Sequence, residues 1–219
     1  VLMQALGRHL VVEPVHACLH EAAAVLSLAG SEVQKQRWLP GIASGEHRLA
    51  LAHSESGHES PWQVPRLLAT PTANGWRLSG QKRAIRAGPG AARWIVSATT
   101  VDGGVRFFLV DPRTHGLVLE DYDTTEGGRA ADASFDSVEV SHEDLLGDAS
   151  ADAGSLLRTA LSVSTLMRCW EASGVMQAAA EQTASYMQQR KQFGRPLSEF
   201  QVVQHRLAEM SVCSTEAQA

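Results

Sequence analysis

The spacing of hydrophobic residues changes twice along this 219-residue chain. Between residues 2 and 38 they recur every three or four positions, which predicts helices, with a stop at Gly30. Short runs of β-branched and aromatic residues fill the stretch from 47 to 147, and helical spacing returns from Ser155. The sequence therefore predicts an α+β protein in which a β region lies between two helical regions.

The β region is expected to be a sheet or barrel. Asn74-Gly75 predicts a hairpin with a type I′ turn, because both central positions of that turn need a positive φ. Turn-rich stretches near Gly45 and from Gly147 to Gly154 predict domains at 1–47, 48–148 and 149–219. The β-type runs are Leu49 to His53, Trp76 to Leu78, Arg93 to Ala98, Val105 to Val110 and Ala133 to Val140.

Charge and cysteine content exclude several functional classes. The chain has 19 basic and 24 acidic residues, dispersed along its length, so no nucleic-acid surface is expected. No apolar run reaches the roughly 18 residues of a membrane span. Cys18, Cys169 and Cys213 show no paired spacing, which argues against disulfides or a zinc module and favours a cytoplasmic protein.

A basic turn separates two helical patterns near the C-terminal end. Arg190 and Lys191 end the first helix, and Gly194 and Pro196 interrupt the chain before helical spacing resumes at Phe200. Such a turn can bind an anion, since Arg offers a planar fork of donors. Positive charge at a helix C-terminus also favours the helix dipole, so a capping role is the simpler alternative.

The sequence Arg190-Lys-Gln-Phe-Gly-Arg-Pro-Leu-Ser-Glu-Phe-Gln201 resembles the signature of acyl-CoA dehydrogenases, Arg-x-Gln-Phe-Gly-x-Pro-hydrophobic-x-x-Phe-Gln. The resemblance extends back to Gly30-Ser-Glu-Val-Gln-Lys-Gln-Arg-Trp-Leu-Pro40. It implies N-terminal helices, a middle β-barrel domain and a C-terminal helical bundle, here truncated at both ends. It also implies that Arg190, Gln192 and Phe193 hold the ADP half of an FAD bound by a neighbouring subunit, which requires a homo- or hetero-oligomer, a dimer or tetramer.

A polar loop, Ala50-Leu-Ala-His-Ser-Glu-Ser-Gly-His-Glu-Ser-Pro-Trp62, is similar to the family's Thr-Glu-Pro-x-x-Gly-Ser-Asp loop, which lies against the flavin. The resemblance places Ser54 at the flavin-facing hydroxyl, Glu55 at the acid and Ser60 at the diphosphate-facing serine. Three positions depart from the pattern: Ser56, Glu59 and Pro61 replace proline, glycine and aspartate. A plain surface turn is the alternative.

The segment Gly80-Gln-Lys-Arg-Ala-Ile-Arg-Ala-Gly88 resembles the family's Gly-x-Lys-x-x-Ile-Thr-x-Gly strand beside the flavin ring. Ala84 stands at an aromatic position and Arg86 at a threonine. Arg86 has three interpretations: it stabilises the anionic reduced ring, occupies the space of the ring, or is a solvated residue on an edge strand. Arg129, in a similar Gly-x-Arg segment, is expected to be held by carboxylates.

The resemblance requires a carboxylate base, and its identity is not given by the sequence. In most of the family it lies beyond the position matching residue 219, and in a minority near Ser164, which has no carboxyl group. Glu171 is the nearest carboxylate, although its surroundings favour helix packing. His53 and His58 flank the polar loop and are expected to form local hydrogen bonds; without a third ligand, no metal is expected.

These motifs together favour FAD-dependent oxidation of an acyl-CoA to the trans-2-enoyl-CoA, with electrons passed to an electron-transfer flavoprotein. They most resemble small subunits of heteromeric bacterial members, of the pimeloyl-CoA dehydrogenase small-subunit type. One alternative is a non-catalytic or half-site subunit that completes the FAD pocket of a partner. Another is a flavin monooxygenase or acyl-CoA oxidase, because fold does not fix chemistry.

Overall fold

The computed structural model describes residues 1–58, 60–148 and 153–218. Glu59 and the predicted domain boundary after residue 148 fall outside or at the edge of these ranges. The chain divides into two compact units: Val12–Ser164, and Val1–Val11 together with Thr165–Ala219. No helix in the described ranges has the length and apolar character to cross a membrane.

Four short helices precede the sheet, and they interrupt the predicted helical run. α1 (Leu2–Arg8) ends well before the π-helix η1 (His16–Ala23), which continues into α2 (Ala24–Ala29). The break was not predicted; it contains Pro14, which lacks the N–H that a helix interior needs, and Leu10 at φ 49°. α3 (Glu32–Ala43) begins with a reciprocal cap between Ser31 and Gln34.

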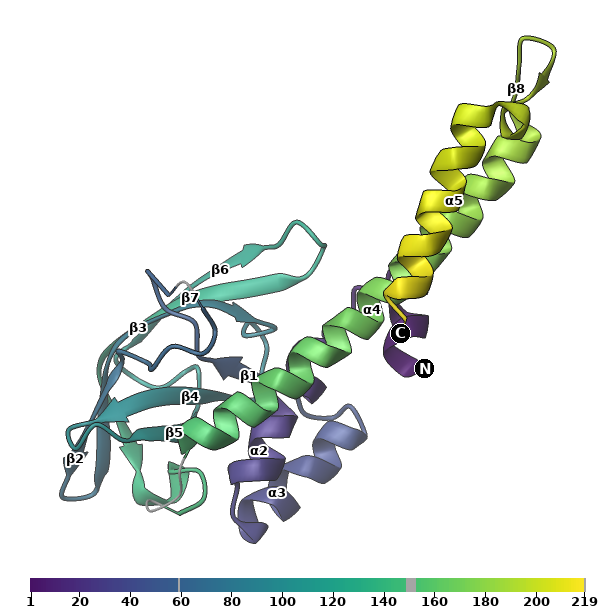
Figure 1. The fold of residues 1–219 in the computed structure, drawn as a ribbon. Helices are drawn as coiled ribbons and strands as arrows, with labels where there is room; N and C mark the ends of the chain where they lie inside the picture. The colour runs from purple at the N-terminus through teal and green to yellow at the C-terminus, as the bar shows by residue number, and fades with distance from the viewer. Residues whose placement is uncertain (59, 149–152, 219) are drawn as a thin grey trace. The chain divides into compact units, whose positions relative to one another are not determined.

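Seven strands form one curled, mixed sheet (Figure 1). They are β1 (Leu49–Ala52), β2 (Leu68–Thr72), β3 (Gly75–Arg86), β4 (Arg93–Thr100), β5 (Val105–Val110), β6 (Leu117–Asp123) and β7 (Arg129–Ser141). The order is β1-β4-β2-β3-β7-β6, with β5 beside β4; β4 is parallel to β1 and β2, and the other pairs are antiparallel. A 3-10 turn, η2 (His142–Asp144), follows the sheet. The predicted α+β class is confirmed, whereas β6 was missed and β2 was implied only by the hairpin predicted at Asn74-Gly75.

Successive side chains of the central strands point to opposite faces of the sheet, and a hydrophobic core lies on each face. Within β4, Ile95 joins the core shared with the N-terminal helices and the start of α4 (Ala153–Gln189). Its neighbours Trp94 and Val96 point to the other face, into the core enclosed by the curled sheet. Side chains on a strand alternate between faces, so each strand of this kind joins both cores.

The β2–β3 hairpin forms as predicted, but its turn is not type I′. Thr72 pairs with Gly75, which makes Ala73 and Asn74 the loop residues, and neither has a positive φ. Gly75 itself has φ 156° and lies against β7, where a Cβ would be 2.0 Å from the carbonyl oxygen of Val140. Close backbone approach explains this glycine better than turn geometry.

We expect Gly75→Ala to lower the free energy of unfolding by about 3 kcal/mol, because the added methyl group forces β3 away from β7. Gly103→Ala is the matched control: Gly103 has φ 82° with open space around it, so the substitution costs only about 1 kcal/mol of backbone strain. Urea denaturation measures both. Equal losses for the two variants would show that strand crowding at Gly75 is unimportant.

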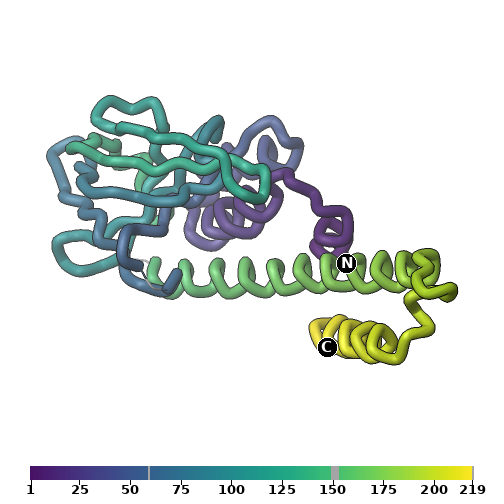
Figure 2. Tube along the Cα trace, turned by 90° about the horizontal axis from the view of Figure 1, so that it is seen from above, coloured from purple at the N-terminus to yellow at the C-terminus, as the bar shows by residue number. Residues whose placement is uncertain are grey.

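The second unit contains most of the long helix α4 and a reversal of the chain (Figure 2). After α4 come the two-residue strands β8 (Lys191–Gln192) and β9 (Arg195–Pro196), the 3-10 turn η3 (Leu197–Glu199) and α5 (Gln201–Glu216). α1 belongs to this unit and crosses α4 closely, because a Cβ on Gly174 would be 2.0 Å from the carbonyl oxygen of Gln4. The basic turn predicted from the sequence is thus a small β8–β9 hairpin.

Candidate functional site

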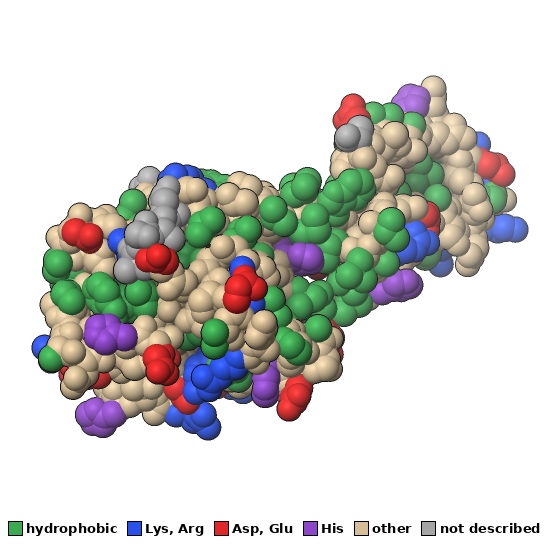
Figure 3. All heavy atoms as spheres, turned by 90° about the horizontal axis from the view of Figure 1, so that it is seen from below, with side chains coloured by type: hydrophobic (Ala, Val, Ile, Leu, Met, Phe, Trp, Pro, Cys, Tyr) green, Lys and Arg blue, Asp and Glu red, His purple; other side chains and the backbone are tan. Residues whose placement is uncertain are grey.

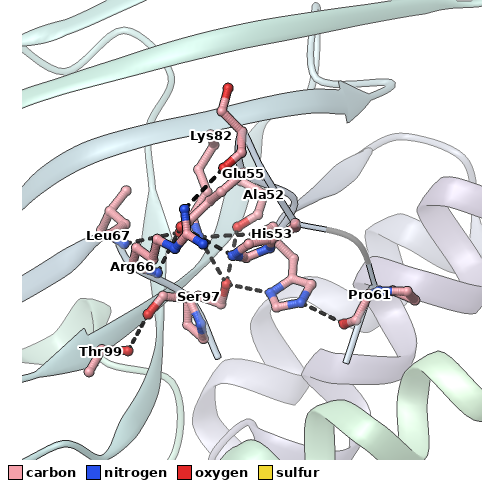
Figure 4. A network of polar contacts seen from close by, with 12 residues as sticks. Ala52, His53, Glu55, Pro61, Arg66, Leu67, Lys82, Ser97 and Thr99 are labelled. Atoms are coloured by element: carbon pink, nitrogen blue, oxygen red, sulfur yellow. Dashed lines mark hydrogen bonds and ion pairs between the residues drawn. The ribbon is translucent and has the colours of Figure 1, made fainter. Parts of the chain in front are cut away.

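The loop from 53 to 67, between β1 and β2, is fastened by a buried polar network (Figure 4). Lys82 of β3 lies at its centre with no exposed surface. Its ammonium group donates to the Glu55 carboxylate at 2.6 Å, and to the His53 carbonyl and the Ser97 hydroxyl at 3.2 Å each. Burial lowers the pKa of Lys82 to about 8, although the Glu55 charge opposes that shift.

Glu55 connects the two ends of this loop. Its Oε1 accepts from the backbone N–H of Leu67 at 3.0 Å, and its Oε2 accepts from that of Arg66 at 2.7 Å. Burial would raise the pKa of Glu55, but the hydrogen bond and charge of Lys82, together with the backbone hydrogen bonds from Leu67 and Arg66, hold that pKa below its usual value. The acid matched to the family loop therefore serves as an internal anchor, ionised and paired within the sheet.

His53 supplies a second fastening and is neutral. Its Nε2 lies 2.8 Å from the carbonyl oxygen of Pro61, so Nε2 carries the proton, because a carbonyl only accepts. Its Nδ1 then accepts from the Ser97 hydroxyl at 2.8 Å. Burial, followed by the Lys82 charge, lowers the pKa of His53 to about 4. The expectation of hydrogen bonds is confirmed for His53 but not for His58, whose buried ring nitrogens form none with the described residues, although its Nε2 lies 3.4 Å from Glu55 Oε2.

The two serines expected to face the cofactor lie at different points of the loop. Ser54 is exposed, and its carbonyl accepts from the backbone N–H of Arg83 at 2.8 Å, which holds it beside β3. The Ser60 hydroxyl accepts from the backbone N–H of Trp62 at 3.2 Å, so it takes part in a local turn. Ser54 is therefore the serine whose hydroxyl is presented to solvent beside β3.

Arg86 is engaged by a buried carboxylate from the N-terminal helices. Its guanidinium forms an ion pair with Glu21 of η1. Glu21 also accepts from the Ser164 hydroxyl at 3.3 Å, and that hydroxyl lies 2.9 Å from His16 Nε2. The interpretation of Arg86 as a solvated residue on an edge strand is wrong about the strand, because β3 lies between β2 and β7, and the side chain, although 35% exposed, is paired with an acid of η1. A π-helix such as η1 is often found at functional sites.

The basic turn presents its side chains outward. Phe193 is 89% exposed at φ 52°, and its ring makes an edge-type contact with the Phe200 ring, with centroids 6.2 Å apart. Arg190 and Gln192 are also exposed. Within the described ranges the Arg190 guanidinium forms no hydrogen bond or ion pair, whereas its backbone N–H and carbonyl close the turn with Tyr186 and Leu197. A free guanidinium and a bare aromatic ring thus occupy one hairpin.

Other predicted positions are structural in this fold. Arg129 is held by the carboxylates of Asp121 and Asp123, as expected. Glu171 lies on α4 with its backbone against Gly7 of α1, where a Cβ on the glycine would be 1.9 Å from the Glu171 carbonyl oxygen. In the described ranges no group of three or more His, Cys, Asp or Glu side chains is arranged to hold a metal ion.

Sequence reasoning missed Lys82, Ser97 and Glu21 as members of these networks. The sequence did contain a signal for Lys82, because it lies four residues after Leu78 and therefore on the same face of β3, where both residues are buried. A bulge between Lys82 and Ile85 then changes which residues face the core, so the face of Arg86 cannot be deduced by counting from Lys82. Glu21 gave no local signal, because its partners come from β3 and α4.

Comparisons with known proteins all indicate the acyl-CoA dehydrogenase family. The family model described as "Acyl-CoA dehydrogenase, C-terminal domain" matches residues 154–219. An isovaleryl-CoA dehydrogenase from Oryza sativa is 31% identical over 83% of this chain and 46% of its own length. The chain thus spans about half the length of the curated relatives it matches.

Two solved structures share the fold. A glutaryl-CoA dehydrogenase from Mycobacterium smegmatis, in complex with FADH2, is 27% identical with a TM-score of 0.84, over 90% of this chain and 51% of its own. The ChsE4-ChsE5 complex from Mycobacterium tuberculosis is 28% identical with a TM-score of 0.84, over 98% of this chain and 56% of its own.

Proposed function

Because the chain belongs to the acyl-CoA dehydrogenase family, we propose that it is part of an FAD-dependent enzyme that oxidises an acyl-CoA thioester to the trans-2-enoyl-CoA. The observation that carries this proposal is the outward-facing β8–β9 hairpin, with the exposed Phe193 ring and an Arg190 guanidinium that has no partner among the described residues. We further propose an electron-transfer flavoprotein as the electron acceptor and a cytoplasmic location.

The hairpin residues fit one end of FAD. The Arg190 guanidinium matches the two oxygens of a diphosphate, the Gln192 amide adds a donor, and the Phe193 ring offers a flat apolar surface. These groups turn away from their own bundle, which supports binding of a cofactor held largely by a neighbouring subunit. The chemistry that FAD supplies when bound is acceptance of a hydride from the acyl β-carbon.

An exposed apolar surface supports assembly with another subunit. On the face drawn in Figure 3, hydrophobic side chains gather over the helical part of the chain. Exposed patches of this kind mark interaction surfaces in soluble proteins. On α4 and α5 the exposed hydrophobic residues include Leu166, Val175, Tyr186, Val202 and Val212.

The base that removes the α-proton is proposed to come from outside residues 1–219. Ser164 has no carboxyl group, and Glu171 belongs to the α1–α4 crossing. Glu21 is a buried carboxylate, but it is already engaged in the ion pair with Arg86 and in a hydrogen bond from Ser164.

Anaerobic reduction tests the proposal in the complete protein. FAD-loaded protein should lose its flavin absorbance on addition of an acyl-CoA from a chain-length series, and mass spectrometry should detect the enoyl-CoA. Rapid peroxide formation in air without an acceptor would instead indicate an oxidase. A yellow protein that no acyl-CoA bleaches, alone or with a partner subunit, would refute dehydrogenation.

A second candidate is a subunit that completes the FAD pocket of a partner, as in the small subunits of the pimeloyl-CoA dehydrogenase type. The Arg86–Glu21 ion pair favours it, since a position expected to face the flavin ring is committed to an internal acid. The similar ChsE4-ChsE5 structure is itself a complex of two proteins. A protein that is colourless alone and yellow only with its partner would support this candidate.

A further inference from the structure

We propose that Lys82 and Glu55 are positioning residues that fix the two ends of the loop between β1 and β2, at residues 53–55 and 65–67, in one arrangement. Their buried ion pair acts through backbone groups at both ends of the loop. That this loop faces a cofactor rests on the proposed function, whereas the fastening itself rests on the contacts described above.

Each hydrogen of the Lys82 ammonium group has its own acceptor. One lies at the start of the loop, the His53 carbonyl; one is the Glu55 carboxylate; and one is the Ser97 hydroxyl on β4. Two of these acceptors belong to the start of the loop and the third belongs to β4, so a single cation on β3 ties β4 and the loop to its own strand. An ammonium group whose donors are all satisfied tolerates complete burial.

Glu55 extends this fastening to the far end of the loop. Its two oxygens accept from consecutive backbone N–H groups, those of Arg66 and Leu67, immediately before β2 begins. Thr99 of β4 reinforces the same end, because its backbone N–H donates to the Leu67 carbonyl at 2.8 Å and its hydroxyl donates to the Pro65 carbonyl. Movement of either loop end therefore requires breaking hydrogen bonds to charged groups.

A buried ion pair is a costly way to gain stability alone, since well-packed apolar residues often do as well. Its advantage is directional: hydrogen bonds to specific backbone atoms define one loop geometry, which an apolar contact does not. Here the carboxylate and ammonium contact backbone groups at both loop ends, which is the arrangement that specifies shape. Ser54, exposed and next to Glu55, is thereby held at a fixed place beside β3.

Trypsin cleavage after Arg66 measures the fastening, because Leu67 is only 1% exposed and the bond is protected while the loop is closed. In the complete protein, Lys82→Met and Glu55→Gln should each raise the native-state cleavage rate at this bond at least tenfold. The double variant Lys82→Met/Glu55→Gln should regain melting temperature relative to either single variant yet stay cleavable. The loop of the double variant stays cleavable because the methionine and glutamine side chains cannot form the charge-assisted hydrogen bonds that hold its ends.

Leu78→Ala is the matched control, a buried residue on the same face of β3 that lacks polar contacts. It should lower the melting temperature comparably while raising cleavage after Arg66 far less. Equal cleavage in Leu78→Ala and Lys82→Met at matched melting temperatures would overturn the proposal. FAD affinity is measured in parallel: if wild type binds no FAD, the proposed function fails, while the cleavage comparison still decides the role of Lys82.

Discussion

Replacing Arg190 with alanine in the complete, assembled protein is expected to weaken FAD binding about ten- to hundredfold. The estimate follows from the loss of a hydrogen bond between charged groups, worth roughly 1.5–3 kcal/mol, at tenfold per 1.4 kcal/mol. Because the guanidinium has no partner among the described residues and is exposed, its removal should leave the melting temperature of the FAD-free protein nearly unchanged. Titration of the FAD-depleted protein, followed by flavin fluorescence, measures the affinity.

Arg206→Ala provides the matched control for this prediction. Arg206 is an exposed arginine on α5 whose ion pair with Glu209 stays on its own helix, so its loss changes net charge equally. FAD affinity should be retained in that variant and reduced several-fold in Phe193→Ala. If Arg190→Ala instead lowers the melting temperature without FAD and leaves affinity intact, Arg190 only caps α4.

The local patterns of the sequence were sufficient to predict much of the fold. Strand β5 coincides with the predicted run from Val105 to Val110, and α4 extends the helix predicted from Ser155 by a few residues. Alternation in β4 and β5 follows directly from a period of two, since both faces of these strands are buried. β6 was missed because only its first residue escapes exposure and acidic residues lie on both of its faces, Glu120 on one and Asp121 and Asp123 on the other.

Contacts between distant segments could not be predicted from those patterns. The loop that carries Glu55 follows β1, and β1 pairs in parallel with β4 although β2 and β3 lie between these strands in the sequence. This pairing brings Glu55 next to Lys82 of β3. Arg86 meets Glu21 only after η1 is placed over the end of β3. The spacing of residues in the sequence does not predict the Lys82–Glu55 or the Arg86–Glu21 contact. The resemblance placed Ser54 and Arg86 near a cofactor, but it did not identify Glu21 as the partner of Arg86.

The acid side of the stability curve should depend on His53. Its folded pKa is about 4, below the ordinary 6.5, because burial disfavours the imidazolium and Lys82 repels it. The unfolded chain therefore binds the proton first, so the stabilisation is complete above pH 6.5 and is lost as pH falls toward 4. The shift corresponds to roughly 3 kcal/mol of unfolding free energy.

Urea denaturation at pH 7.5 and at pH 4.5 isolates this contribution. His53→Gln keeps a donor for the Pro61 carbonyl but does not titrate, so its loss of stability between the two pH values should be smaller than that of wild type. His115→Gln, on an exposed histidine, should behave like wild type. Glu55 adds a loss of the same sign, since its pKa is also lowered, and that part should persist in His53→Gln. An unchanged pH dependence in His53→Gln would mean that the buried imidazole accepts a proton without opening the loop, and the neutral tautomer between Ser97 and Pro61 would be the wrong assignment.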